Sequence, residues 1–257
     1  MITRFPILLV ASVLLAVAAH ANTHDPQLQK VLHKHLDAMG GLANWNRVES
    51  IQLNGTIERD GQFVDLVIVK KRPNQIRATV TIPVPGKEDE FFQIIRAHDG
   101  KTAWTATRLA GQLDMTREVL PEEAAAKLLA DAGVLPPLIK LWRGDADLKL
   151  LVSEVIDSQN YHTIRVTGED FPSEYTFYLD AETYFVTQYE TVHPTHGVTR
   201  TSLGDYTKTH NVLLPKRNEI QADQTGQSIM TTDSIKVGVG IYREYFEADN
   251  LRNTAKL

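Results

Sequence analysis

The sequence has no cysteine among its 257 residues, and this absence removes several chemistries at once. A chain without thiols has no disulfide framework, no thiolate metal site, no cysteine nucleophile and no lipid-modified cysteine. It also lacks an excess of basic residues, because 27 Lys and Arg stand against 32 Asp and Glu and the formal net charge is −5. This balance argues against nucleic acid as a partner.

Long apolar runs are missing after the first 21 residues, so no later segment is predicted to span a bilayer. The N-terminus carries one early positive charge, Arg4, then an apolar run that ends at Ala19, and the small residue Ala21. This pattern is typical of a secretory signal peptide over residues 1–21. A membrane anchor is the alternative, but the run is shorter than the roughly 20 residues that a spanning helix needs. We therefore expect an exported chain, residues 22–257, which would lie in the periplasm of a two-membrane bacterium.

Helical periodicity is confined to three segments. Apolar residues three and four apart predict a helix from Pro26 to Met39, and glycines end it. Two further helices are predicted over Pro121–Ala132 and Pro136–Trp142. Elsewhere apolar residues alternate with polar ones between turn residues, which predicts about twelve antiparallel strands. No linker or shift in composition divides residues 22–257, which indicates a single domain.

These elements predict a mainly β fold with helices, of the α+β class. A sheet of so many strands twists and curls, and its apolar face has to be covered. The N-terminal helix and the helical segment 121–142 are the available covers. The pattern therefore predicts a curled antiparallel sheet that forms an incomplete barrel, with the central segment as a lid. The enclosed space is either a packed core or an apolar cavity, and the composition alone fits both.

Two motifs resemble the LolA family of periplasmic lipoprotein carriers. The first is Lys-Arg-Pro-Asn at residues 71–74, and the second is Asp-Gly-Lys-Thr at residues 99–102, followed by Trp104. Ala-Met-Gly-Gly at residues 38–41 is similar to a wider group of outer-membrane lipoprotein-sorting proteins. The resemblance implies an open barrel with a helical lid, whose cavity accepts lipoprotein acyl chains and passes them to an outer-membrane receptor.

The resemblance also implies roles for particular residues. In the carriers, the arginine of the first motif bonds to the lid and helps to hold it shut, and this role falls to Arg72; a solvated strand-end arginine is the alternative. The carriers have an aromatic residue where this chain has Ile76. The candidate cavity-lining residues are Leu53, Ile57, Leu66, Ile68, Ile76, Val80, Ile94, Trp104 and Phe177. The candidate lid residues are Leu128, Leu129, Leu138, Ile139, Leu141 and Trp142. Residues of both sets are also what a plain core would contain.

Catalytic motifs are absent from the sequence. It has no Gly-x-Ser-x-Gly, no His-Glu-x-x-His, no phosphate-binding loop and no glycine-rich dinucleotide turn, so we predict no enzyme activity and no cofactor. His193 and His196 share one predicted loop and could meet Asp205 or His210. Such a chance pairing is weak, and we predict no metal site.

The leading hypothesis is a periplasmic carrier for lipoproteins or another acylated lipid. An inner-membrane transporter and an outer-membrane receptor are the partners that the resemblance implies. Two alternatives remain: a lipid-binding sensor or accessory subunit of an envelope complex, and, less favoured, a hydrolase that acts in the same cavity.

Overall fold

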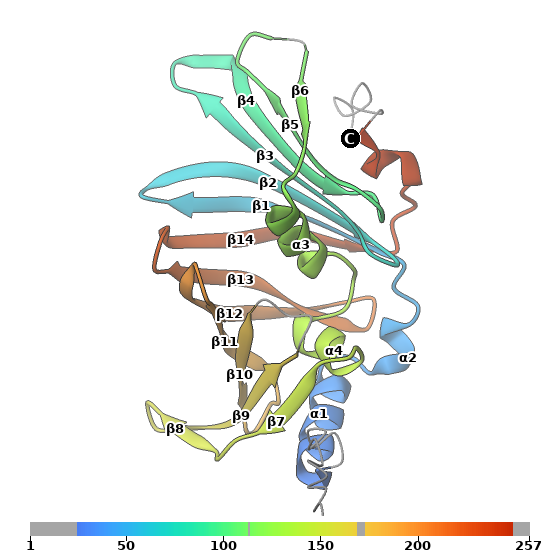
Figure 1. The fold of residues 1–257 in the computed structure, drawn as a ribbon, viewed down its shortest axis with the longest axis vertical. Coiled ribbons are helices and arrows are strands. Elements are labelled where there is room, and N and C mark those ends of the chain that lie inside the picture. Colours follow the sequence, from blue (N-terminus) through green and yellow to red (C-terminus); the bar gives the residue numbers. More distant parts are fainter. Residues whose placement is uncertain (1–24, 113, 169–172, 249–257) are drawn as a thin grey trace, which may run out of the picture.

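The computed structural model describes residues 25–112, 114–168 and 173–248. The predicted signal peptide lies outside these residues. The described strands form one open, curved antiparallel sheet of 14 strands (Figure 1). The predicted fold class, a curled sheet with few helices, is confirmed.

The chain enters this sheet in the middle and builds it in two directions. One half consists of β1 (Ser50–Arg59), β2 (Gln62–Lys71), β3 (Gln75–Val84), β4 (Lys87–His98), β5 (Ala103–Arg108) and β6 (Thr116–Val119). The other half consists of β7 (Asp147–Leu150), β8 (Glu154–Ile156), β9 (Gln159–Thr167), β10 (Glu174–Asp180), β11 (Val186–His193), β12 (Gly197–Thr209), β13 (Val212–Ala222) and β14 (Gly226–Val237). The order is β6-β5-β4-β3-β2-β1-β14-β13-β12-β11-β10-β9-β7, and β8 pairs with β9. The first and last strands therefore meet at the centre of the sheet.

Four helices and one 3₁₀ turn accompany the sheet. They are α1 (Pro26–Ala38), α2 (Leu42–Trp45), α3 (Glu122–Asp131), α4 (Pro137–Trp142) and η1 (Arg243–Phe246). The three predicted helices correspond to α1, α3 and α4, whereas α2 and η1 are short and have no sequence period to reveal them. In the described part of the chain, no helix is long and apolar enough to cross a membrane.

Local sequence explains both ends of α1. The Asp25 carboxylate accepts a hydrogen bond from the Gln27 amide at 2.8 Å, which satisfies a donor that the first turn leaves free. The predicted glycine stop is found after the helix, where Gly40 has a φ of +111°. A Cβ at Gly40 would lie 2.2 Å from the Asn211 carbonyl oxygen. Glycine therefore lets the end of α1 pack closely against the β12–β13 turn.

Two stretches differ from their predicted secondary structure. The sequence from Leu148 to Ile156 predicts one strand, but the structure divides it into β7 and β8, and between them the Leu151 amide donates to the Thr163 carbonyl at 2.8 Å. The two prolines and the charged residues over positions 83–90 predict a polar loop, but most of this stretch forms the tip of the β3–β4 hairpin. Backbone pairing with neighbouring strands decides where these strands begin and end. The residue pattern within one strand does not show which neighbours it will pair with.

One face of the sheet, here called the inner face, carries the predicted apolar alternation. Leu53 pairs with Ile68, Ile68 with Ala78, and Val80 with Ile94. Since paired residues point to the same side, these side chains all lie on one face. Leu53 also packs against the cluster that includes Ile139 of α4, so this is the face that the helices cover.

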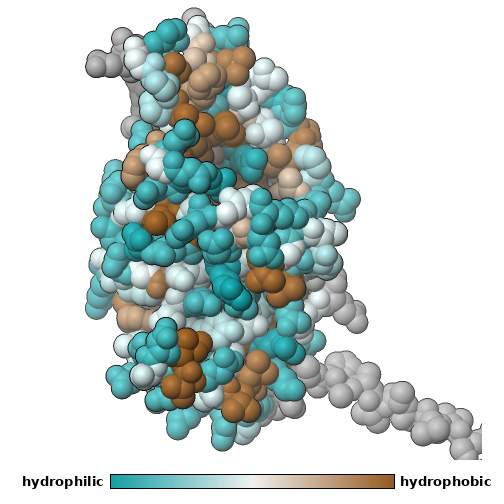
Figure 2. Space-filling view, turned by 90° about the vertical axis from the view of Figure 1, so that its left-hand side faces the viewer, coloured by the Kyte–Doolittle hydropathy of each residue, from teal (hydrophilic) through white to brown (hydrophobic). Residues whose placement is uncertain are grey.

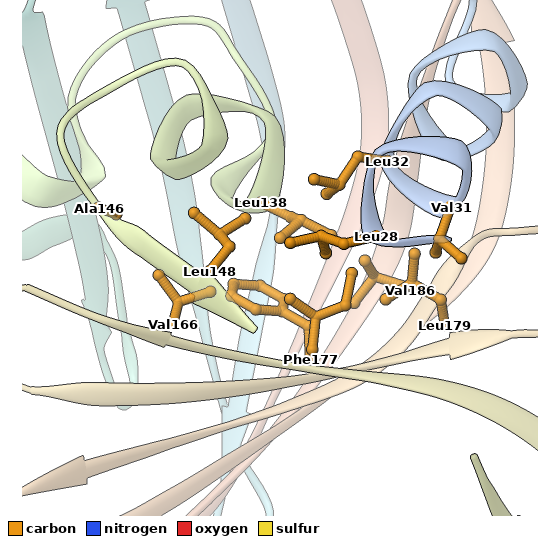
Figure 3. Packing of buried hydrophobic residues seen from close by; sticks show 11 residues of the cluster. Leu28, Val31, Leu32, Leu138, Ala146, Leu148, Val166, Phe177, Leu179 and Val186 are labelled. Carbon is orange, nitrogen blue, oxygen red and sulfur yellow. The ribbon is translucent and has the colours of Figure 1, made fainter. Parts of the chain in front are cut away.

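The inner face of strands β7 to β13, here called the β7–β13 half, is filled by side chains. Leu28 and Leu32 of α1 and Leu138 of α4 pack against Phe177 of β10, as Figure 3 shows. Ile164 of β9 belongs to the same buried cluster. All five are at most 1% exposed. Helices α1 and α4 and these strands therefore form an ordinary close-packed core.

The outer face of the β1–β6 half is covered by the C-terminal segment 238–248. Trp104 donates its indole N–H to the Phe246 carbonyl at 2.9 Å, and Arg77 donates to the Tyr245 carbonyl at 2.8 Å. Trp104 pairs with Ala97 and clusters with Ile95, both on this outer face. The prediction that Trp104 lines the inner cavity is therefore wrong, because both faces of this half-sheet bury apolar residues.

Candidate functional site

The inner face of β1–β4 is the candidate site. Leu53, Ile57, Ile68, Val80 and Ile94 lie on it and are half-buried, so each keeps part of its side chain accessible. Two further predicted lining residues, Leu66 and Ile76, share this face and are buried. In Figure 2, apolar residues lie in the upper part of the molecule, at the height of this half of the sheet in Figure 1, and further apolar patches lie lower down.

Helix α3 crosses this region but fills little of it. None of its residues is buried, and Leu129 is 38% exposed. In α4, by contrast, Leu138 and Ile139 are at most 1% exposed. The predicted lid residues therefore fall into two groups: Leu128 and Leu129 on a loosely packed helix, and Leu138, Ile139, Leu141 and Trp142 on a helix that packs into the core.

The end of α3 is fixed by a lysine of α4. The Lys140 ammonium donates to the carbonyl oxygens of Leu129, Ala130 and Ala132, at 3.2, 2.8 and 2.8 Å. These carbonyls belong to the C-terminal turn, which lacks helical donors and carries the negative end of the helix dipole. The contact therefore joins α3 to the well-packed α4.

A charged cluster lies where α3 ends. Burial lowers the pKa of Lys70 on the inner face, and the nearby Asp131 carboxylate opposes this shift. Burial also lowers the pKa of Lys140, and the charge of Lys70 lowers it further. Burial raises the pKa of Tyr189 on β11 to about 12, and Asp131 adds to that shift. Because Asp131 acts on groups of both half-sheets, the end of α3 lies between them.

Arg72 makes different contacts from those that the resemblance implies. Its guanidinium donates to the Val48 carbonyl through Nε at 2.8 Å and to the Trp45 carbonyl through Nη2 at 3.0 Å. Both acceptors belong to α2 and the turn before β1. The guanidinium thus bonds to the α2 turn, in place of the hydrogen bond to the lid that the resemblance implies.

The two motifs nevertheless lie side by side, and the first touches the lid. The Gln75 side chain, directly after the first motif, donates to the Asp99 carbonyl of the second at 2.9 Å. The backbone oxygen of Pro73 lies 3.3 Å from where a Cβ of Gly133 would be, and Gly133 has a φ of +86°. Contact between this motif and the α3–α4 connection is therefore made by closely packed backbone, not by the arginine side chain.

Phe177, the last of the predicted lining residues, lies on β10. It lies on the inner face but is 1% exposed within the packed cluster of Figure 3. It therefore belongs to the core of the β7–β13 half. The seven lining residues on β1–β4 share one face, as their alternation predicted.

Sequence reasoning missed the charged groups around α3. Lys70 lies 61 residues before Asp131 in the sequence, and only tertiary structure brings it to Asp131 and Lys140. The one available signal was Lys70 itself, a lysine that follows Val64, Leu66 and Ile68 along the inner face of β2. Glu123 of α3 was missed as well: it meets His196, which the sequence had paired with Asp205 or His210.

Comparison with known proteins supports the architecture. No family profile and no curated protein matches the sequence. A LolA superfamily protein from Nitrosomonas europaea superposes on 87% of this chain and 98% of its own, with a TM-score of 0.57 and 16% identity. This chain has the LolA-like fold.

Two other structures with this LolA-like fold cover the same share of the chain. A DUF1329 family protein from Desulfovibrio piger covers 87% with a TM-score of 0.56 and 10% identity. A domain named for outer membrane lipoprotein sorting, from Vibrio parahaemolyticus, covers 87% with a TM-score of 0.54 and 11% identity. The LolA-like architecture expected from the two motifs is thus confirmed as a fold.

Proposed function

We propose that this protein is a carrier that binds the acyl chains of a lipoprotein or a related lipid on the inner face of β1–β4. The observation that carries the proposal is the half-buried apolar surface of Leu53, Ile57, Ile68, Val80 and Ile94, beneath a helix with no buried residue. The LolA-like fold and a neighbour named for lipoprotein sorting support it.

The chemistry of this surface suits an acyl chain. Each methylene that leaves water contributes roughly 0.8 kcal/mol, and this contribution needs no hydrogen-bond partner. A loosely packed α3 allows such a chain to enter and leave without unfolding the core of the other half. Under this proposal the exported chain works in the periplasm, between an inner-membrane transporter and an outer-membrane receptor.

A matched pair of variants tests where the lipid binds. Ile68 lies on the inner face of β2, and its neighbour Val67 points to the outer face. We expect Ile68→Glu to weaken the binding of a fluorescent fatty acid at least tenfold, because a buried carboxylate replaces apolar contact. Val67→Glu should bind within twofold of the unchanged protein.

Two outcomes would count against the carrier. Equal binding by both variants would show that the lipid lies elsewhere, and no binding of any acylated probe would end the lipid proposal. Transfer of a purified lipoprotein to acceptor membranes then separates a carrier from a lipid-binding sensor, because only a carrier releases its cargo to a membrane. Turnover of an acyl ester by the unchanged protein, lost in Ile68→Glu, would favour the hydrolase.

A further inference from the structure

Three side chains with metal-binding atoms converge at the far end of α3. Glu123 stands in its first turn, His193 ends β11, and His196 lies in the turn before β12. One ligand atom from each lies within 4.8 Å of the others. The Glu123 carboxylate is in direct contact with Nε2 of His196.

The turn that carries the two histidines is held in place by its neighbours. The Thr195 hydroxyl contacts Nδ1 of His193 at 3.0 Å, and the imidazoles of His193 and His196 stack with centroids 4.5 Å apart. Gln224, in the β13–β14 turn, donates to the Thr195 carbonyl at 3.1 Å. Such supporting contacts fix the orientation of imidazole ligands before a metal arrives.

Two imidazoles and one carboxylate are a ligand set that suits zinc. Zn²⁺ takes histidine nitrogen and carboxylate oxygen, and three protein ligands leave a fourth tetrahedral position for water. Calcium and magnesium prefer all-oxygen sets, so they fit this group poorly. We propose that Glu123, His193 and His196 bind Zn²⁺ or a similar divalent transition metal, which ties α3 to the β11–β12 turn.

Among the described helices, α3 is the one without a buried residue, and the site would control its position. α3 has no buried residue, whereas the β11–β12 turn belongs to the half-sheet with the packed core. Here the closed state has α3 in contact with the turn, and the open state has it detached. A metal that binds only the closed state multiplies the closed-to-open ratio by a factor of one plus the metal concentration divided by Kd. At a metal concentration of 100 times Kd, opening of α3 should become about 100-fold rarer.

The experiment measures metal binding directly, without lipid. The protein is expressed from its full sequence without a polyhistidine tag, treated with EDTA and titrated with Zn²⁺ against a chromophoric chelator. We expect one equivalent to bind, and Glu123→Gln, His193→Ala and His196→Ala each to weaken binding at least tenfold. His33→Ala, which removes an exposed imidazole from α1, is the matched control and should bind Zn²⁺ unchanged.

Hydrogen exchange at residues 122–131 tests the link to α3. Saturating Zn²⁺ should slow exchange there about 100-fold at 100 times Kd, and at the same Zn²⁺ concentration should slow exchange in the His196→Ala variant by about tenfold or less. No Zn²⁺ binding at micromolar concentration, or full binding by the three variants, would overturn the site. Binding with unchanged exchange would overturn the tie to α3. Because no lipid is present, none of these results depends on the carrier proposal.

Discussion

The inner face of the β7–β13 half and the inner face of β1–β4 carry the same alternation of apolar residues, but helices cover the first closely and the second only in part. In the first, α1 and α4 pack Leu28, Leu32 and Leu138 against the strands. In the second, α3 lies across the sheet and none of its own residues is buried. The same strand pattern thus gives a solid core in one half and a partly accessible apolar surface in the other.

The difference shows that apolar alternation specifies a face that avoids water, and not what covers it. Water or a guest molecule covers part of the β1–β4 surface when protein side chains do not. Burial contributes about 25 cal/mol per Å² of apolar surface. The free energy of burying the surface that is still open can therefore be gained when a lipid covers it. Under the proposed function, stability and lipid binding therefore fall to different halves of one sheet.

The same substitution in α4 and α3 should have very different costs. Leu138→Ala removes a fully buried side chain and should lower the free energy of unfolding by about 3 kcal/mol. Leu129→Ala, at a position that is 38% exposed, should cost less than about 0.5 kcal/mol. Urea denaturation of both variants measures the contrast, and similar losses would contradict the division into a packed and a loosely covered half.

A buried histidine should make the packed half sensitive to acid. Nδ1 of His35 donates to the Tyr184 carbonyl at 2.8 Å, and burial lowers the pKa of His35 from 6.5 to about 4. The unfolded chain therefore takes up this proton first as the pH falls. The contribution of His35 to the free energy of unfolding is complete above pH 6.5. It falls progressively, by about 3 kcal/mol, as the pH drops to 4.

Denaturation at several pH values checks this acid sensitivity. In His35→Gln, the part of the pH dependence between pH 6.5 and pH 4 should shrink. His33→Ala on the exposed side of α1 is the control and should keep the full dependence. An unchanged slope in His35→Gln would show that other groups cause the acid sensitivity.

Arg72 sharpens the comparison because its contacts lie outside both inner surfaces. Arg72→Leu removes hydrogen bonds to the Trp45 and Val48 carbonyls and should cost about 1.5 kcal/mol. Hydrogen exchange should rise around residues 45–50 and stay unchanged over 122–131. Faster exchange confined to residues 122–131 would instead favour the lid-locking role that the resemblance implies.

Lys140 should show a smaller global effect than Leu138, His35 or Arg72, and a more local one. Lys140→Met keeps the apolar stem but removes the donor to Leu129, Ala130 and Ala132, which should cost about 1 kcal/mol. We expect faster exchange in the last turn of α3 and little change in α4. Lys127→Met, an exposed lysine of α3, is the control and should leave the exchange unchanged.

Much of the fold could be predicted because its signals are local. Asp25 and Pro26 begin α1, Gly40 ends it, and alternation marks the strands. Trp104 could not be assigned to a face in this way. The segment 238–248 that covers it is more than a hundred residues further along the chain. Alternation in β5 marks an apolar side, Trp104 and Ala106, but does not show that this side is the outer face of the sheet.

The features of the candidate site also fall into those that local sequence predicts and those that depend on tertiary contacts. The sequence by itself determined α1, α3 and α4, most of the strands, and the face shared by Leu53, Ile68 and Val80, since hydrogen-bonding period and side-chain alternation are properties of neighbouring residues. Only the tertiary structure decided that α3 stays unburied and that Glu123 meets His196 across 73 residues. Those outcomes depend on how far the sheet curls and on which elements reach each other, and the energy of such contacts exists only once the chain has folded.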